Sequence, residues 1–211
     1  MIPRILKSAF RRRVPKATPK ESALVLYNQF VSSQDVVVEV GTLFGGGTCV
    51  LAKLAKQVYS FEPVRYNYWA TVQNTKNFDN VKVYNLALGS RSESSKINIY
   101  SREGRIAYGG SSFTNFQRLS IRKKENVKIV ALDSLVLELK PSVLVSDCEG
   151  SEREVLEGSR NSIPNLRCIL IEEHKTLDRL QEFFQSCESE FVTSYGDRYK
   201  KWLIAEKRKD I

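Results

Sequence analysis

Paired cysteines are absent from this sequence. Cys49, Cys148, Cys168 and Cys187 are scattered, and no two of them have the Cys-x-x-Cys spacing of a zinc ribbon. The same scatter argues against a disulfide framework. We therefore predict four core thiols in a protein of a reducing compartment, which indicates a cytoplasmic location.

Long apolar runs are lacking as well. Hydrophobic residues make up 42% of the chain, an ordinary share for a globular protein, and no run approaches the length of a membrane span. A chain of 211 residues is long enough for one domain with a sizeable core. We predict that domain at residues 35–206, after a basic helical extension at residues 1–34 and before a basic tail at residues 207–211.

Acidic residues are missing from the first 20 positions, which carry seven Lys or Arg residues. The rest of the chain holds 26 basic and 24 acidic residues, so most of the net charge of +9 lies at the amino terminus. An enzyme that acts on nucleic acid usually spreads basic charge over its catalytic face. This distribution therefore does not favour a nucleic-acid partner, although it does not exclude a nucleic-acid partner.

The amino-terminal stretch has the pattern of an amphipathic basic helix. Apolar residues from Ile2 to Phe10 follow helical spacing, so residues 1–14 could lie on a membrane surface, bind an acidic partner, or pack on the domain. A second helix is predicted after it. Thr18 to Glu21 have the pattern of a capping box with proline at the first helical position, and this helix should extend to about Phe30.

A lysine is missing from the glycine-rich stretch at residues 36–47, Val-Val-Val-Glu-Val-Gly-Thr-Leu-Phe-Gly-Gly-Gly. The valines predict a buried strand and the spacing after the glycines predicts a helix. Gly41 and Gly46 have Walker spacing, but Gly47 stands where that loop needs lysine, which argues against a P-loop. Leu43 replaces the second glycine of the dinucleotide fingerprint, so NAD is disfavoured without being eliminated.

The pattern that remains is Glu39-x-Gly41-x-x-x-Gly45. Glycine reaches φ > 0 and lets a ligand approach the N–H groups at the start of a helix. An acid two positions before the first glycine resembles the first motif of class I S-adenosylmethionine-dependent methyltransferases. Thr42 and Gly46 belong to the same loop and are candidate cofactor-binding residues with it.

Two further strand ends carry candidate cofactor contacts. Residues 58–63 read as a strand ending in Glu62 and Pro63, and a carboxylate at that position accepts hydrogen bonds from ribose hydroxyls in doubly wound sheets. Residues 81–85 form a third predicted strand. Asn85 and Ala87 follow it, where a short amide and apolar neighbours could hold an adenine.

Residues 90–131 fit no simple strand and helix unit. We predict strands at residues 96–100 and 126–131, with a loop at residues 104–112 between them. Six basic residues against one acid lie between residues 101 and 124: Arg102, Arg105, Arg118, Arg122, Lys123 and Lys124. This basic cluster is either the solvated loop that such runs commonly form or a surface that faces an anionic substrate.

Carboxylates gather after the fourth and fifth predicted strands. Residues 142–146 lead to Asp147 and Glu149, and residues 168–171 lead to Glu173 and His174, the single histidine of the chain. Ligands of open α/β sheets bind at these carboxyl ends, and carboxylates there are costly unless solvated, paired or used. A helix at residues 177–187 and an antiparallel strand pair turning at residues 196–197 complete the chain.

With these pieces in order, the sequence resembles the FkbM family of S-adenosylmethionine-dependent methyltransferases over residues 35–205. The matching strings are Val-Glu-Val-Gly at residues 38–41, Tyr-Ser-Phe-Glu-Pro at 59–63, Asn-Leu-Ala-Leu-Gly at 85–89, Leu-Asp-Ser-Leu at 132–135, Asp-Cys-Glu-Gly-Ser-Glu at 147–152 and Glu-Glu at 172–173. The family often has lysine two residues before the Asp of its Asp-x-Glu-Gly motif, where this chain has Val145. Its first motif usually carries Asp and Asn where this chain has Glu39 and Leu43.

The resemblance implies a Rossmann-like, doubly wound, mostly parallel seven-stranded sheet with an antiparallel carboxyl-terminal strand pair and helices on both faces. It also implies S-adenosylmethionine as cofactor, held by Glu39, Gly41 and Glu62, with Asn85 and Ala87 near the adenine. Asp147 and Glu149 would lie where the methyl acceptor meets the sulfonium. The expected acceptor is a hydroxyl of a small molecule or saccharide.

Methyl transfer is an in-line displacement, so the protein aligns the acceptor and takes its proton. We expect Glu149 or Asp147 to orient or deprotonate the acceptor, with His174 as the alternative base. No metal is required, although Asp147, Glu149, Glu173 and His174 are compatible with a weak divalent site. Two alternatives remain open: an RNA methyltransferase that uses the basic amino terminus and the basic cluster, and an NAD- or nucleotide-binding protein.

Overall fold

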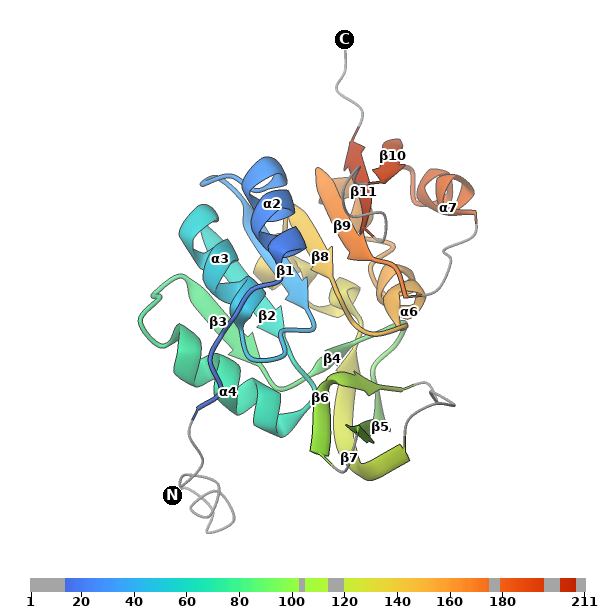
Figure 1. Ribbon diagram of the computed structural model, residues 1–211. Coiled ribbons are helices and arrows are strands. Elements are labelled where there is room, and N and C mark those ends of the chain that lie inside the picture. The colour runs from blue at the N-terminus through green and yellow to red at the C-terminus, as the bar shows by residue number, and fades with distance from the viewer. Residues whose placement is uncertain (1–13, 103–104, 114–119, 175–178, 196–201, 208–211) are drawn as a thin grey trace.

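A central sheet of seven strands carries the fold of the computed structural model, which describes residues 14–102, 105–113, 120–174, 179–195 and 202–207. The strand order is β10-β11-β9-β8-β1-β2-β3 (Figure 1). The strands are β1 (Val36–Val40), β2 (Gln57–Phe61), β3 (Val81–Tyr84), β8 (Val143–Ser146), β9 (Cys168–Glu172), β10 (Phe191–Tyr195) and β11 (Trp202–Lys207). β11 is antiparallel to β9 and β10, and the other pairs are parallel. The predicted fold class is confirmed.

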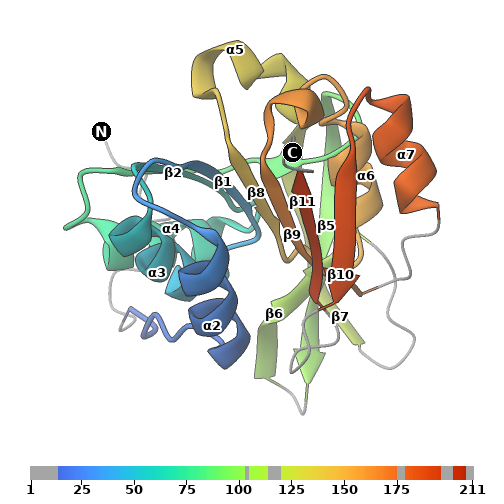
Figure 2. The same cartoon turned by 90° about the horizontal axis from the view of Figure 1, so that it is seen from above.

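Helices cover both faces of this sheet (Figure 2). One face carries α2 (Glu21–Phe30) and α3 (Gly46–Leu54), with α4 (Arg65–Thr75) beside α3. The other face carries α5 (Val136–Leu139), α6 (Glu152–Glu157) and α7 (Leu180–Ser186), with the short 3-10 helices η1 (Leu132–Ser134) and η2 (Ile163–Asn165). No helix among the described residues is long and apolar enough to cross a membrane.

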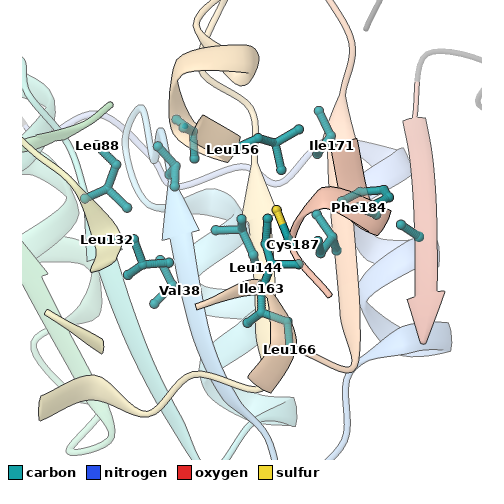
Figure 3. Close-up of a cluster of buried hydrophobic side chains, with 14 of the residues drawn as sticks. Val38, Leu88, Leu132, Leu144, Leu156, Ile163, Leu166, Ile171, Phe184 and Cys187 are labelled. Carbon is teal, nitrogen blue, oxygen red and sulfur yellow. The ribbon is translucent and has the colours of Figure 1, made fainter. Parts of the chain in front are cut away.

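Alternate side chains of the strands point to opposite faces of the sheet, which is why the buried strands read as continuous apolar runs. Val37 packs with Leu26 of α2 and Leu51 of α3, whereas Val38 packs in the cluster on the opposite face. Figure 3 shows that second cluster, in which Leu144, Leu156, Ile163, Leu166, Ile171 and Phe184 meet between the sheet and α6, η2 and α7. The two cores hold the helices on the two faces of the sheet and so fix the position of the carboxyl ends of its parallel strands.

A second sheet, of order β4-β7-β5-β6, lies beside the carboxyl ends of the central strands (Figure 1). Its strands are β4 (Ala87–Leu88), β5 (Glu93–Arg102), β6 (Arg105–Ser112) and β7 (Ser120–Val130). The loop predicted at residues 104–112 is therefore wrong over residues 105–112, and Gly104 lies outside the described residues. The described members of the basic cluster lie on strands rather than in a loop, and Arg118 is not described. β6 contains two adjacent glycines and β7 begins with five exposed residues, so neither sequence shows the alternation of apolar and polar residues that is typical of a strand. Both strands are stabilised by pairing with β5.

Several predicted boundaries also differ. The capping box at Thr18 is wrong, because α2 begins at Glu21 after Lys20 and has no side-chain cap. The last helix begins at Leu180, and residues 175–178 lie outside the described part of the chain, as do the predicted turn at residues 196–197 and most of the helix at residues 1–14. Although α2 was assigned to the extension, its residues Ala23, Leu26 and Tyr27 are buried against the sheet.

Candidate active site

A cavity of about 230 Å³ opens at the carboxyl ends of β1, β2 and β8. Of the predicted site residues, nine line it: Glu39, Gly41, Thr42, Gly46, Glu62, Pro63, Ala87, Asp147 and Glu149. β6 closes one side through Tyr108 and Gly109, and the segment before α2 closes another through Lys16, Thr18 and Lys20. Five parts of the chain that are distant in the sequence therefore build one site.

The glycine loop between β1 and α3 is pressed between two other backbones. Gly41 has φ +83°, and a Cβ at this position would lie 2.1 Å from the carbonyl oxygen of Asp147. A Cβ at Gly46 would lie 2.5 Å from the carbonyl oxygen of Thr18. Gly45 precedes α3 with φ +82° and is not among the residues that line the cavity. These positions require glycine because of backbone conformation and close approach.

Glu39 is held beneath the glycine loop rather than facing open solvent. Its Oε2 accepts hydrogen bonds from Oγ1 of Thr48, at 2.6 Å, and from Oγ of Ser60, at 2.7 Å. The side chain is buried, and burial raises the pKa of Glu39 to about 7 against the opposing effect of these two hydroxyls. Glu39 thus joins β1 to α3 and β2 while it lines the cavity.

Glu62 binds the backbone of the glycine loop. Its Oε2 accepts hydrogen bonds from the amide N–H groups of Thr42 and Leu43, both at 3.1 Å, and its Oε1 accepts one from Val64 at 2.9 Å. Burial raises the pKa of Glu62 to about 7 although these N–H groups favour the charged form. Asn85 does not line the cavity; its amide donates hydrogen bonds to the carbonyl oxygens of Glu62 and Pro63.

Asp147 and Glu172 are bridged by Lys20. The Nζ of Lys20 lies 2.7 Å from Oδ2 of Asp147 and 2.5 Å from Oε2 of Glu172. Burial raises the pKa of Asp147 to about 6, and Lys20 opposes this rise. The pKa of Glu172 falls below its ordinary value, because hydrogen bonding and charge from Lys20 outweigh burial. The lysine therefore stabilises charged carboxylates at the ends of β8 and β9.

His174 lies beside the same carboxylates. Its Nδ1 is 2.9 Å from Oε1 of Glu152, a residue that is 1% exposed, and its Nε2 is 3.4 Å from Oε2 of Glu149 and 3.9 Å from Oδ1 of Asp147. The hydrogen bond with Glu152, followed by the charges of the other carboxylates, raises the pKa of His174 to about 9 despite burial. Burial raises the pKa of Glu149. His174 is therefore protonated at neutral pH, and Asp147 and Glu149 are the carboxyl groups beside it whose pKa is raised.

One ligand atom from each of Asp147, Glu149 and His174 lies within 4.8 Å of the other two. Glu173, which the sequence placed with them, is not in this group. The three atoms have the chemistry of a divalent site, but two positive side chains, Lys20 and His174, already contact these carboxylates.

Two groups of the site escaped sequence analysis. Lys20 lies 127 positions before Asp147, and nothing local to it indicates a contact with the sheet. Glu152 belongs to the string that carries the family resemblance. Its place in the first turn of α6 is explained by the favourable interaction of an acid with the helix dipole, so the sequence does not mark it as a site residue. Its burial under His174 is a signal that only the folded chain reveals.

The cavity has polar atoms suited to a ligand with both donors and acceptors. Oδ1 of Asn67, Oδ1 of Asp147 and Nε1 of Trp202 are buried and have no hydrogen-bond partner among the described residues. All three residues line the cavity. Buried polar atoms without partners are costly, so a bound molecule that satisfies them gains affinity. Ala87, Leu88 and Ile97 add apolar lining to the same cavity.

The fold and site define a Rossmann-like methyltransferase: a glycine loop after β1, an acid at the end of β2 and carboxylates after β8. The sequence model of the methyltransferase FkbM domain matches residues 39–199, and the chain belongs to this family. The resemblance seen in the sequence is thereby confirmed.

Individual relatives are more distant. The hexuronic acid methyltransferase AglP of Haloferax volcanii is 25% identical over 169 residues, covering 79% of this chain and 67% of AglP. Methyltransferase FkbM from Methylobacillus flagellatus has a TM-score of 0.57 at 18% identity, over 90% of this chain and 48% of that protein. M. capricolum TrmK, bound to S-adenosylhomocysteine, has a TM-score of 0.52 at 12% identity, over 88% and 68% of the two chains. This chain thus spans about half the length of the Methylobacillus protein, and the structural likenesses show the fold alone.

Proposed function

We propose that this protein transfers a methyl group from S-adenosylmethionine to a hydroxyl of a saccharide or a similar small molecule. Family membership supports the cofactor, and the name of the related AglP supports a sugar acceptor. The observation that carries the acceptor chemistry is the contact between Glu149 and His174. It places a carboxylate at the cavity next to an imidazolium that buried Glu152 holds in place.

S-adenosylmethionine supplies an electrophilic methyl group when it is bound. Glu62, the glycine loop, Ala87 and Leu88 all line the cavity. We assign the ribose to Glu62 and the loop, and the adenine to Ala87 and Leu88. Glu149 accepts the proton of the acceptor hydroxyl. Its raised pKa brings it closer to the range in which a general base works, and His174 stabilises it by charge.

Charge favours a neutral acceptor over a polyanion. Asp147, Glu149, Glu152 and Glu172 lie within one cluster, and among the described residues Lys20 and His174 are the positive side chains that form ion pairs with them. An excess of negative charge repels phosphate, which argues against RNA at this end of the cavity. The exposed Arg122 and Lys124 of the basic cluster lie on β7, and neither lines the cavity.

The test is transfer of a radiolabelled methyl group to a panel of neutral hexoses, hexuronic acids and unmodified tRNA. We expect transfer to a sugar. The variant Glu149→Gln should lose about 100-fold or more in kcat, the usual contribution of a general base. Glu154→Gln, on the exposed side of α6 five residues away, is the matched control and should retain activity. Transfer to tRNA alone would overturn the acceptor class, and full activity of Glu149→Gln would overturn the role of the carboxylate.

A further inference from the structure

The segment that precedes α2 completes the cavity although it lies outside the family match at residues 39–199. Lys16, Thr18 and Lys20 all line the cavity. The carbonyl oxygen of Pro15 accepts a hydrogen bond of 2.9 Å from Nδ2 of Asn74 on α4, and Thr18 packs on Gly46 of the glycine loop. The segment is thus anchored along the cavity before it reaches Lys20.

Lys20 supplies a positive charge that the neighbouring strand does not carry. Position 145, two residues before Asp147 on β8, is occupied by Val145, which is 1% exposed and packs in the core between the sheet and α2. Lys20 instead belongs to the segment before α2, and its Nζ contacts the two carboxylates at the ends of β8 and β9. Half of its side chain remains exposed, so the contact lies at the wall of the cavity.

The two oxygens of Asp147 have different environments. Oδ2 is bound by Lys20 at 2.7 Å. Oδ1 is buried, has no hydrogen-bond partner among the described residues, and is 3.9 Å from Nε2 of His174, beyond hydrogen-bond reach. A buried carboxylate oxygen without a donor is costly, and a bound molecule can supply that donor.

We infer that Lys20 is a positioning residue for cofactor binding: it fixes Oδ2 of Asp147 and thereby leaves Oδ1 to accept a hydrogen bond from the amino group of the bound cofactor. This inference rests on the proposed function. An ammonium group fits because the surrounding cluster carries more negative than positive side chains. Lys20 prevents Asp147 and Glu172 from repelling each other while that oxygen stays free.

The charged and titratable groups around Asp147 come from several elements. They are Lys20 before α2, Tyr27 of α2, Glu39 of β1, Glu149 after β8, Glu172 of β9 and His174 after β9. Of these, Lys20 is the group that donates a hydrogen bond to Asp147 among the described contacts. Its removal changes the orientation of the carboxylate and leaves it beside the negative charge of Glu172.

Two ligands separate this role from a general effect on the fold. S-adenosylhomocysteine carries the amino group, whereas 5′-methylthioadenosine keeps the nucleoside and lacks the whole amino-acid portion, so the double substitution with Asp147 assigns the effect within that portion. We expect Lys20→Met to weaken S-adenosylhomocysteine about fivefold in isothermal titration, the effect of about 1 kcal/mol at a partly exposed ion pair, and to leave 5′-methylthioadenosine unchanged. Lys20→Arg should restore most of the affinity. The exposed Lys56→Met, before β2 at the opposite edge of the sheet, is the matched control.

A double substitution tests the coupling to Asp147. Asp147→Asn should weaken the same ligand, and Lys20→Met should add nothing in that background, because the oxygen that it positions is gone. Equal loss for both ligands in a folded Lys20→Met variant, or no loss for either, would overturn the inference. Wild-type protein that binds neither ligand would instead overturn the proposed function, so the two failures are distinguishable. Thermal unfolding of each variant establishes that it is folded.

Discussion

Nδ1 of His174 lies 2.9 Å from Oε1 of Glu152, and this pair orients the imidazole so that Nε2 faces Glu149. Glu152 is almost fully buried, and its Oε1 also accepts a hydrogen bond from the N–H of Gly150 at 3.0 Å. The Asp-x-Glu-Gly loop and the end of β9 are therefore joined through one carboxylate. The single histidine of the chain acts here as a fixed positive charge.

The first prediction concerns stability against pH. Because the pKa of His174 is raised to about 9, its stabilising contribution is fully present below the ordinary value of 6.5 and is lost as the pH rises through 9. Glu152→Gln removes the main cause of this rise. In urea unfolding, we expect the free energy of unfolding of the wild type to exceed that of Glu152→Gln by about 2 kcal/mol at pH 6, with a smaller gap at pH 9.5. A gap that is constant with pH would contradict this account, and Glu154→Gln provides the control.

The second prediction concerns Glu62 and cofactor affinity. Burial raises its pKa to about 7, and ribose hydroxyls donate to the carboxylate form. The group is largely protonated at pH 6 and largely charged at pH 8, so the affinity for S-adenosylhomocysteine should increase about tenfold over this interval. Glu62→Gln should bind more weakly, since its amide opposes the N–H groups of Thr42 and Val64. Its pH dependence should be smaller, and the remainder comes from Glu39 and Asp147, whose pKa values are raised to about 7 and about 6. Isothermal titration at several pH values measures both, and an unchanged slope in Glu62→Gln would exclude this residue as the cause.

The third prediction concerns metal. Lys20 and protonated His174 already place two positive charges against Asp147, Glu149 and Glu172, which reduces the attraction of this cluster for a divalent ion. We therefore expect methyl transfer to survive dialysis against EDTA, and added Mg²⁺ to leave the thermal unfolding midpoint unchanged. Loss of activity that Mg²⁺ restores would instead show that the ligand atoms of Asp147, Glu149 and His174 hold a cation.

The central sheet could be predicted from the sequence because each of its seven strands is a short apolar or alternating run. The small sheet could not. β6 contains Gly109 and Gly110, and β7 begins with five exposed residues, so neither has the period-2 pattern of a strand buried on one face. Their strand conformation comes from pairing with β5, which is a contact between distant parts of the chain.

The site likewise contains residues that the sequence pattern indicates and others, Lys20 among them, that it does not. The sequence pattern put Glu39, Glu62, Asp147 and Glu149 at or just after strand ends, and they line the cavity because parallel strands deliver their carboxyl ends to one edge. Lys20 was assigned to a helix cap, since its local neighbours Thr18 and Glu21 have that pattern. Its contact with Asp147 depends on the path of the segment over Gly46, which no spacing in the sequence encodes. A contact between residues 127 positions apart leaves no local pattern in the sequence.

The fourth prediction concerns an ion pair at the opposite edge of the sheet. Asp35 precedes β1 and is 2% exposed; its Oδ1 accepts hydrogen bonds from Nε of Arg167 and Oγ of Ser142, both at 2.8 Å, and its Oδ2 contacts Nη2 of Arg167. Burial raises the pKa of Asp35, but Arg167 and the neighbouring serines outweigh it and lower the pKa to about 2. The stabilisation is therefore present above the ordinary value of 3.8 and is lost as the pH falls through 2.

Arg167→Met leaves this buried carboxylate without its cation, and we expect a loss of about 2 kcal/mol in the free energy of unfolding at pH 7, reduced from the value for a fully buried pair because Arg167 is 43% exposed. Arg91→Met removes an exposed pair with Glu93 and should change stability by less than about 0.5 kcal/mol. Urea unfolding measures both. Because Arg167 lies at the amino end of β9, Arg167→Met should leave the affinity for S-adenosylhomocysteine unchanged. Equal losses in the two variants would mean that burial of Asp35 does not determine the energetics of this pair.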